Sequence, residues 1–185
     1  MSFDPVMSNY VNGSFIIWHL VDIVAKGGQM QIGYGPDANG QFHPLAVEAL
    51  EYAGRWLQTN GEAIYSSRTF VHGNGTVSWQ DSASGQVRYT RSKDNQTVFA
   101  IVLAGFGAAP TILGGELPLA DLTITPGSAV YLLGYEHESN RTQIPIGWKA
   151  KPGGGVILQV PADCAAHPAI LDPGMTFVAQ VKQLW

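Results

Sequence analysis

Hydrophobic residues recur at helical spacing in two stretches near the amino terminus, and the two stretches differ in how much of their surface is apolar. Over Ser14 to Lys26, apolar side chains point in nearly every direction, and His19, Asp22 and Lys26 form one narrow polar stripe. Gly27-Gly28 follows, and glycine tolerates the positive φ at which helices commonly end. The pattern predicts a helix that needs neighbours on most of its sides.

A second helix is predicted over Pro44 to Thr59, and this one is amphipathic. Proline fits the first helical position, where its missing N–H costs no hydrogen bond, and Asn60-Gly61 supplies the stop. Glu51 and Arg55 have the spacing of an ion pair on the polar face. The expected buried stripe consists of Ala46, Ala49, Leu50, Ala53, Trp56 and Leu57.

Between the helices, residues Met30 to Tyr34 alternate as a β-strand does, with Met30, Ile32 and Tyr34 on one side. Helix, strand and helix with short loops amount to one and a half repeats of an α/β barrel. One strand cannot form a sheet, so we expect it to pair with other strands of this chain or with a partner.

From about Thr69 onward, short β-type runs alternate with turn residues, which predicts an antiparallel β-sandwich. The expected fold is therefore mixed α/β followed by all-β, with residues 1–66 as the last elements of a barrel and residues 67–185 as a sandwich domain. The predicted strands are Val77–Trp79, Val87–Thr90, Thr97–Leu103, Leu122–Ile124, Ala129–Leu133, Val156–Val160 and Thr176–Lys182.

Three segments between Leu20 and Tyr65, LVDIVAKGG, GPDANG and RWLQTNGEAIY, resemble the end of the catalytic barrel in the family 29 glycoside hydrolases, the retaining α-L-fucosidases. VYLLGYE and VILQVP resemble strands of the β-sandwich that follows the barrel in that family. The strand departs from the family pattern NLLLNIGP: it is QMQIGYGP here, with Gly33 in place of the second Asn.

The resemblance implies cleavage of terminal α-L-fucose from oligosaccharides and glycoproteins, with retention and without a metal or cofactor. Such chemistry needs a carboxylate nucleophile and a carboxylic acid/base about 5–5.5 Å apart. In the family, both groups and the histidines that hold fucose lie upstream of the matched region. We therefore expect no catalytic residue in this chain, and we expect the chain by itself to be inactive.

Four residues near the predicted strand are candidates for a site. Asp37 lies just past the carboxyl end of the strand, where barrel enzymes hold their chemistry, and it is the fallback catalyst. Pro36 to Gly40 also has the composition of a tight turn, and we favour that interpretation of Asp37. Gln31, Tyr34 and His43 could line the rim of a sugar pocket, although structural roles would explain them equally.

No pattern predicts a metal site or a reactive thiol. His19 and Asp22 lie three residues apart but lack a third ligand, so a solvated helix face is expected instead. Glu136-His137-Glu138 has the same weakness and is expected to be a turn or strand end. Cys164, the only cysteine, is expected to be a small buried hydrophobe.

Charge and composition exclude some partners and indicate a compartment. The net charge is −4 without a Lys/Arg cluster, so neither nucleic acid nor an anionic membrane is an expected partner. No signal peptide is expected, because residues 1–10 contain neither a basic residue nor an apolar core. Four of the seven asparagines head Asn-x-Ser/Thr sequons, which favours a secreted or lysosomal protein unless turn composition explains them. They are Asn12, Asn74, Asn95 and Asn140.

Three functions remain open from the sequence. The favoured one is the barrel-closing and sandwich portion of a fucosidase, which needs the remaining barrel segment. A carbohydrate-binding, lectin-like module is the second, since aromatic residues of the β-region could stack on sugars, although core packing explains them more simply. They are Trp79, Tyr89, Phe106, Tyr131, Tyr135, Trp148 and Trp185. The third is a remnant that pairs with a second copy of itself through its apolar first helix and lone strand.

Overall fold

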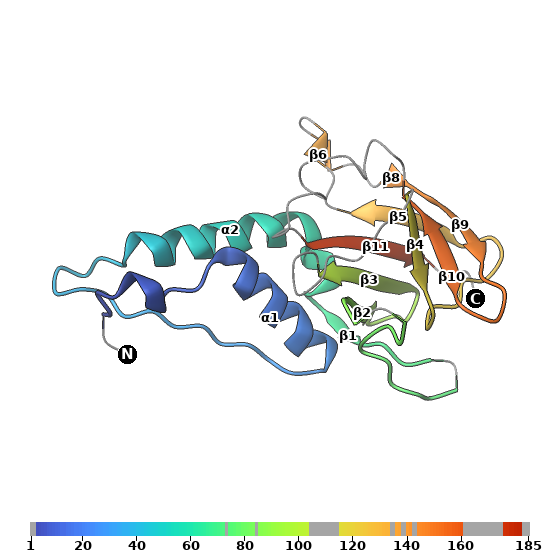
Figure 1. Ribbon diagram of the computed structural model, residues 1–185, viewed down its shortest axis with the longest axis horizontal. Coiled ribbons are helices and arrows are strands. Elements are labelled where there is room, and N and C mark those ends of the chain that lie inside the picture. Colours follow the sequence, from blue (N-terminus) through green and yellow to red (C-terminus); the bar gives the residue numbers. More distant parts are fainter. Residues whose placement is uncertain are drawn as a thin grey trace.

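The computed structural model describes residues 3–72, 74–83, 85–103, 115–133, 136–137, 140–141, 144–160 and 176–182. Two helices form an arm on one side, and antiparallel strands form the body on the other (Figure 1). The helical elements are η1 (Met7–Asn9), α1 (Gly13–Ala25), α2 (Pro44–Asn60) and η2 (Gly61–Ala63). The strands are β1 (Ser67–Thr69), β2 (Val87–Ser92), β3 (Thr97–Leu103), β4 (Glu116–Leu119), β5 (Ala129–Leu133), β6 (Glu136–His137), β7 (Asn140–Arg141), β8 (Ile144–Pro145), β9 (Gly147–Ala150), β10 (Val156–Gln159) and β11 (Thr176–Lys182).

Helix α1 confirms the first predicted helix, shifted by one residue at each end. Asn12 caps its start, because the side-chain oxygen accepts the N–H of Phe15 at 2.8 Å. At the other end Gly27 adopts a φ of +84°, and the N–H of Gly28 donates to the carbonyl of Ile23 at 2.8 Å. The glycine pair therefore ends the helix as its composition predicts.

Helix α2 confirms the second prediction and crosses α1 closely. His43 precedes Pro44, and its Nδ1 accepts the N–H of Leu45 at 3.2 Å. Gly13 lies so close to Tyr52 that a Cβ built on it would be 2.4 Å from the ring, so the crossing requires glycine there. Four residues of the expected stripe are buried, Ala46, Ala49, Ala53 and Trp56, whereas Leu57 is partly buried and Leu50 is 43% exposed.

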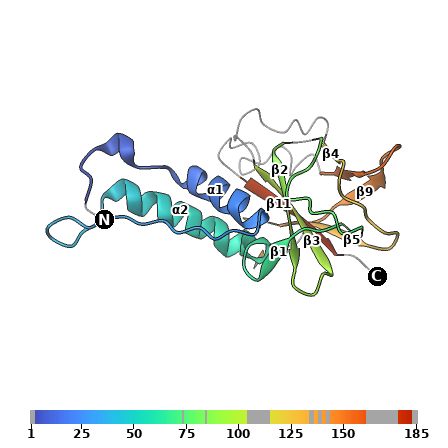
Figure 2. The same cartoon turned by 90° about the horizontal axis from the view of Figure 1, so that it is seen from below.

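The strand predicted over Met30–Tyr34 does not form. The segment is extended and runs back along the underside of the helix pair, from the end of α1 to the far turn before α2 (Figures 1 and 2). No backbone group of residues 29–36 forms a backbone hydrogen bond with another described residue. The prediction is wrong because alternating apolar and polar side chains only give a segment two different faces. A strand also needs a neighbouring strand that forms hydrogen bonds with its backbone.

The strands form a six-stranded sheet in the order β1-β2-β3-β11-β5-β8, a three-stranded sheet β4-β10-β9, and the pair β6-β7. All strand pairs are antiparallel. In the central pair, Thr97 lies opposite Lys182 and Leu103 opposite Thr176. The predictions for β2, β3, β5, β10 and β11 are confirmed, apart from small shifts at their ends.

Two predicted strands are absent for a common reason. Leu122 and Ile124 are buried in the core, but their segment has no partner strand. Val77 forms only an isolated bridge to Val71, so Val77–Trp79 is not a strand either. Apolar composition identified burial correctly in the first case, but it cannot identify a hydrogen-bonding partner.

The six-stranded sheet is covered on both faces. Along β3, Val98, Ala100 and Val102 point into a core shared with residues of β4 and β10. Phe99, Ile101 and Leu103 point into a second core that contains residues of α1 and α2. The continuous apolar run of β3 is explained by this burial on both faces.

Candidate functional site

An aromatic cluster lies where the segments before α1 and α2 meet. The rings of Tyr10 and His43 stack with centroids 4.4 Å apart, and those of Tyr10 and Tyr34 with centroids 5.8 Å apart. Phe3 approaches His43 at 6.1 Å. Two of the predicted candidates, Tyr34 and His43, are therefore brought together by Tyr10. Tyr10 was missed, because nothing in the sequence indicated that this segment returns to α2.

Hydrogen bonds hold this cluster in place. The Tyr10 hydroxyl donates to the backbone carbonyl of Asp4 at 2.7 Å. The Asp4 carboxylate accepts from Asn9 Nδ2 at 2.6 Å and from the N–H of Val6 at 2.9 Å. These bonds, led by that from Asn9, lower the pKa of Asp4, and the charge of His43 adds to the effect.

The hydroxyl of Tyr34 is the unusual atom of the cluster. It is buried and forms no hydrogen bond with any described residue. Burial raises the pKa of Tyr34, and the neighbouring Tyr10 raises it further. A buried hydroxyl without a partner has a free-energy cost, which a ligand that bonds to it would remove.

Asp37 and Gln31 lie outside this cluster. Asp37 Oδ1 accepts the N–H of Asn39 and the N–H of Gln41, both at 2.8 Å. The Asp37 N–H donates to the Gln41 carbonyl at 2.8 Å, so the residue closes the turn before α2. Gln31 is exposed in the extended segment. The geometry of Asp37 thus matches the turn interpretation.

The expectation of a solvated stripe on α1 is wrong at Asp22. Its Oδ1 accepts from Arg88 Nε at 2.7 Å, and its Oδ2 accepts from Lys26 Nζ at 2.6 Å. His19 stacks on Phe15 with centroids 3.8 Å apart. Within the described ranges, no three His, Cys, Asp or Glu side chains gather as a metal site. Glu138 and Cys164 lie outside the described residues.

Four aromatic residues of the β-region have packing or polar partners. Tyr89 is fully buried and Trp148 packs against the core, so core packing explains both residues. Lys26 Nζ lies 4.3 Å from the centre of the Trp79 ring, and Lys182 Nζ lies 5.2 Å from that of Tyr131. Phe106, Tyr135 and Trp185 lie outside the described residues.

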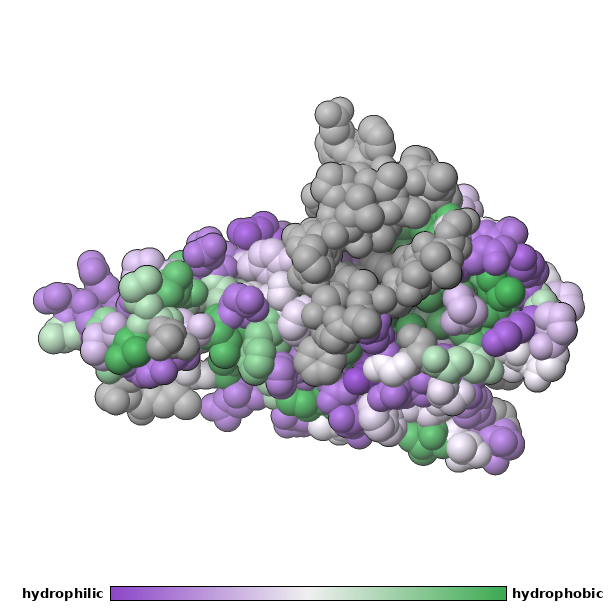
Figure 3. Space-filling model, in the orientation of Figure 1, coloured by the Kyte–Doolittle hydropathy of each residue, from purple (hydrophilic) through white to green (hydrophobic). Residues whose placement is uncertain are grey.

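Apolar side chains also reach the surface of the helical arm. Figure 3 shows hydrophobic surface scattered among polar residues over this arm. The exposed large residues of the arm and its extended segment include Phe15, Ile32, Phe42, Val47 and Leu50. None of the described helices is long and apolar enough to cross a membrane.

Comparison with known proteins gives a consistent family. The family model described as Alpha-L-fucosidase matches residues 2–62. The tissue alpha-L-fucosidase of Rattus norvegicus is 34% identical over 146 residues, which are 77% of this chain and 28% of that protein. An alpha-L-fucosidase of Branchiostoma floridae is 28% identical over 158 residues, which are 85% of this chain and 30% of that protein. The chain thus spans about 30% of the length of such relatives.

Solved structures show the same fold. Alpha-L-fucosidase isoenzyme 1 from Paenibacillus thiaminolyticus matches with a TM-score of 0.70 at 17% identity, over 100% of this chain and 37% of that one. The Thermotoga maritima alpha-fucosidase in complex with fucose matches with a TM-score of 0.64 at 24% identity, over 92% of this chain and 34% of that one.

Proposed function

We propose that this chain, which is a homologue of the family 29 α-L-fucosidases over about 30% of their full length, completes the catalytic barrel of such an enzyme and carries the β-sheets that flank it. Residues 1–66 are the barrel elements in this proposal, and residues 67–185 are the sandwich. The rest of the barrel supplies the nucleophile and the acid/base, and the chain by itself is not a hydrolase.

The observation that carries the proposal is the unpaired extended segment. Residues 29–36 alternate in sequence as a strand does, and none of their backbone groups forms a backbone hydrogen bond with another described residue. The segment lies beneath the two helices (Figures 1 and 2). Strands of an α/β barrel have this position relative to their helices, and neighbouring strands satisfy their backbone groups. Strands from the remaining barrel segment would therefore supply hydrogen-bond partners for the backbone groups of residues 29–36.

The aromatic cluster supports a place for substrate. Barrel enzymes bind substrate at the carboxyl ends of their strands, and Tyr34 lies at that end of the extended segment. We assign Tyr34, His43 and Gln31 to the rim of a fucose pocket, with Asp37 retained only as the fallback catalyst. The Thermotoga maritima relative is described in complex with fucose, which agrees with terminal α-L-fucose as the substrate. Retaining hydrolysis, with a carboxylate nucleophile and an acid/base from the rest of the barrel, is part of the same proposal. No step of that chemistry requires a metal or cofactor.

Hydrolysis of an aryl α-L-fucoside tests the proposal. The purified chain of 185 residues is expected to give no turnover. A chimera in which this chain replaces the matching region of the rat tissue enzyme is expected to hydrolyse the substrate. Turnover by the chain alone, at its intact mass, would overturn the proposal and would direct mutagenesis to Asp37.

Substitution of Gly33 separates strand pairing from general folding. Gly33→Pro removes a backbone N–H that the free chain does not use, so its unfolding temperature should change little. In the chimera the same change should lower activity about 100-fold, because a barrel strand would lose a ladder bond and shift. Gly33→Ala keeps the N–H and is the matched control. Equal activity of the two chimeras would contradict strand pairing.

Tyr34→Phe distinguishes a ligand contact from a packing role. In the free chain it removes a buried hydroxyl without a described partner, so the free energy of unfolding should stay constant or rise by about 1 kcal/mol. In the chimera, kcat/KM for the aryl fucoside should fall about 10-fold through loss of a hydrogen bond to the sugar. A stability loss in the free chain would instead indicate a structural bond.

Self-association is the second candidate, and the exposed apolar residues of the helical arm favour it. If the free chain sediments as a dimer and Gly33→Pro dissociates that dimer, the extended segment pairs with a second copy of the chain and not with the remaining barrel segment. Binding of fucose by the free chain would favour the lectin-like alternative instead.

We also propose a secreted or lysosomal location. Relatives include plasma and tissue enzymes, and two sequon asparagines, Asn74 and Asn95, are exposed in turns. Asn12 differs, because its side chain caps α1. Carbohydrate on Asn74 and Asn95, found by peptide mass mapping of the protein from a eukaryotic host, would support this location.

A further inference from the structure

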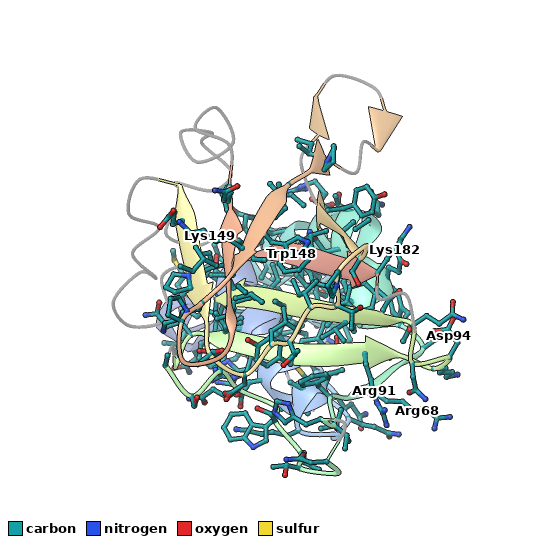
Figure 4. The ribbon with its side chains drawn as sticks, turned by 90° about the vertical axis from the view of Figure 1, so that its right-hand side faces the viewer. Arg68, Arg91, Asp94, Trp148, Lys149 and Lys182 are labelled. Atoms are coloured by element: carbon teal, nitrogen blue, oxygen red, sulfur yellow. The ribbon has the colours of Figure 1, made fainter. Side chains whose placement is uncertain are left out.

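Two arginines face each other at one edge of the six-stranded sheet. Arg68 of β1 and Arg91 of β2 are direct partners in the antiparallel register. They share the sheet face that carries Phe70 and Tyr89 one row further along. Figure 4 shows both side chains together at this edge, well away from Trp148 and Lys149. Like charges directly opposite each other destabilise a strand pair.

No described carboxylate neutralises this pair. The four ion pairs among the described residues involve Lys26, Arg55, Arg88 and Lys149. Asp94, the acid nearest in sequence to Arg91, accepts from Ser92 Oγ and from the N–H of Gln96 in its own turn. The chain has an acidic balance of 14 Asp and Glu against 10 Lys and Arg, so acids are not scarce.

One of the two guanidinium groups is held in position. Arg91 Nε donates to the backbone carbonyl of Thr69 at 3.1 Å, which leaves both of its Nη groups available. Arg91 is half-buried, and Arg68 is exposed on the edge strand. An incoming group can therefore reach the N–H donors of one guanidinium group held by a backbone carbonyl and of one exposed guanidinium group on the same face.

We propose that Arg68 and Arg91 form a binding site for a tetrahedral oxyanion, sulfate or phosphate, either free or as an ester on a glycan. Guanidinium groups match the paired oxygens of such anions, and two of them can share one doubly charged group. A bound oxyanion would also remove the repulsion between the two strands. The proposed site uses residues of β1 and β2 and none of Gln31, Tyr34, Asp37 or His43, so it does not depend on the proposed function.

Thermal unfolding of the full chain tests the site with sodium sulfate and sodium phosphate, each against sodium chloride at equal ionic strength. We expect either oxyanion at about 20 mM to raise Tm by about 2–4 °C beyond chloride. Arg68→Gln and Arg91→Gln should each abolish this difference. Arg55→Gln is the matched control, because Arg55 is exposed on α2 and its one ion pair is at 4.0 Å.

Stability without the anion gives an independent readout. Arg68→Gln removes one of two repelling charges, so in low chloride its Tm should equal or exceed that of the parent chain. Oxyanion stabilisation that persists in both glutamine variants would be a general salting effect and would overturn the proposal. A large fall in Tm for Arg68→Gln without anion would also overturn it, since it would show a structural role.

The source of the oxyanion follows from a comparison of ligands. A sulfated monosaccharide that acts at lower concentration than inorganic sulfate, while its unsulfated parent has no effect, would assign the site to a glycan ester. The reverse order would assign it to the free ion. In either case, the rise in Tm must be absent in Arg68→Gln for the ligand to be assigned to this site.

Discussion

Asp81→Ala is expected to lower the free energy of unfolding by about 3–5 kcal/mol, measured by urea denaturation at pH 7. Asp81 is fully buried, and its carboxylate is a shared acceptor. Its Oδ2 accepts from the Tyr89 hydroxyl at 2.7 Å, from the N–H of Ala120 at 2.8 Å and from the N–H of Asp121 at 3.1 Å. Its Oδ1 accepts the N–H of Ala83 at 3.0 Å.

The size of the effect follows from the donors that alanine would strand. Three backbone N–H groups and one hydroxyl lose their acceptor at once. The segment before β2 loses two of its bonds to the loop after β4, and the bonds from Ser82 to Asp121 remain. Each unsatisfied buried donor costs about 1–3 kcal/mol, less whatever water can recover. Burial and the negative charge of Asp81 raise the pKa of Tyr89 well above its ordinary value, so the hydroxyl remains a donor at neutral pH.

Tyr89→Phe is the matched control for Asp81→Ala. It removes one donor and leaves the other three bonds, so the expected loss is about 1–1.5 kcal/mol. Similar losses for the two variants would show that the tyrosine contact, and not the backbone bonds, accounts for the stabilisation. An Asp81→Ala loss under about 1 kcal/mol would mean that water replaces the carboxylate.

The helices were predictable because their signals are local. Pro44 and the glycines after α1 lie within a turn of the helix ends that they specify. The cap of α1 by Asn12 is equally local, but it was not predicted. The strand β3 was predictable because burial on both faces leaves a continuous apolar run. The short strands β1, β4 and β9 were missed, because their pairing is fixed by distant partners and not by their composition.

The candidate site shows the same limit. Tyr34 and His43 were predicted from their positions beside an expected strand, whereas Tyr10 joins them through a contact that spacing cannot show. Asp22 was expected on a solvated stripe because its ion-pair partner, Arg88, lies 66 residues later in the chain. Polar residues on an otherwise apolar helix are thus ambiguous from sequence, since water and a distant counterion give the same pattern.

Asp22→Asn is expected to cost about 3 kcal/mol of unfolding free energy, and Arg88→Met about 2 kcal/mol, although both remove the same ion pair. The Arg88 side chain is 6% exposed, so loss of Asp22 leaves a buried cation with the Gly85 carbonyl at 2.7 Å as its remaining acceptor. The Asp22 side chain is 28% exposed and keeps Lys26 when Arg88 is removed. The orphaned cation is therefore the costlier state.

The double variant Asp22→Asn/Arg88→Met measures the coupling. It should lose less than the sum of the single losses by about 1–2 kcal/mol, because it has no unpaired buried charge. Lys26→Ala removes the more exposed ion pair of Asp22 and is the control. It should lower the free energy of unfolding by less than about 1 kcal/mol. Additive losses in the double variant would contradict a direct ion pair between α1 and β2.

The pH dependence of this ion pair follows from the titration of Asp22. Burial raises its pKa, but the hydrogen bonds from Lys26 and Arg88 outweigh burial and hold the pKa below the ordinary value of 3.8. The folded state thus binds the proton less readily than the unfolded state, so the contribution of Asp22 is complete above about pH 4 and falls as the pH drops through the lowered pKa. The difference between the parent chain and Asp22→Asn should accordingly shrink from pH 5 towards pH 2.5 in urea titrations.

Arg88 and Asp22 also decide whether the proposed boundary between residues 66 and 67 separates two folding units. The ion pair joins α1 to β2, and the second hydrophobic core joins both helices to Ile101 and Leu103 of β3. If these contacts make one cooperative unit, Asp22→Asn should lower a single unfolding midpoint, which is the same when hydrogen exchange follows the amides of α1 and when it follows those of β3. Two separate midpoints, with only the helical one shifted, would show that the helical arm unfolds independently and that the ion pair does not couple it to the sheet.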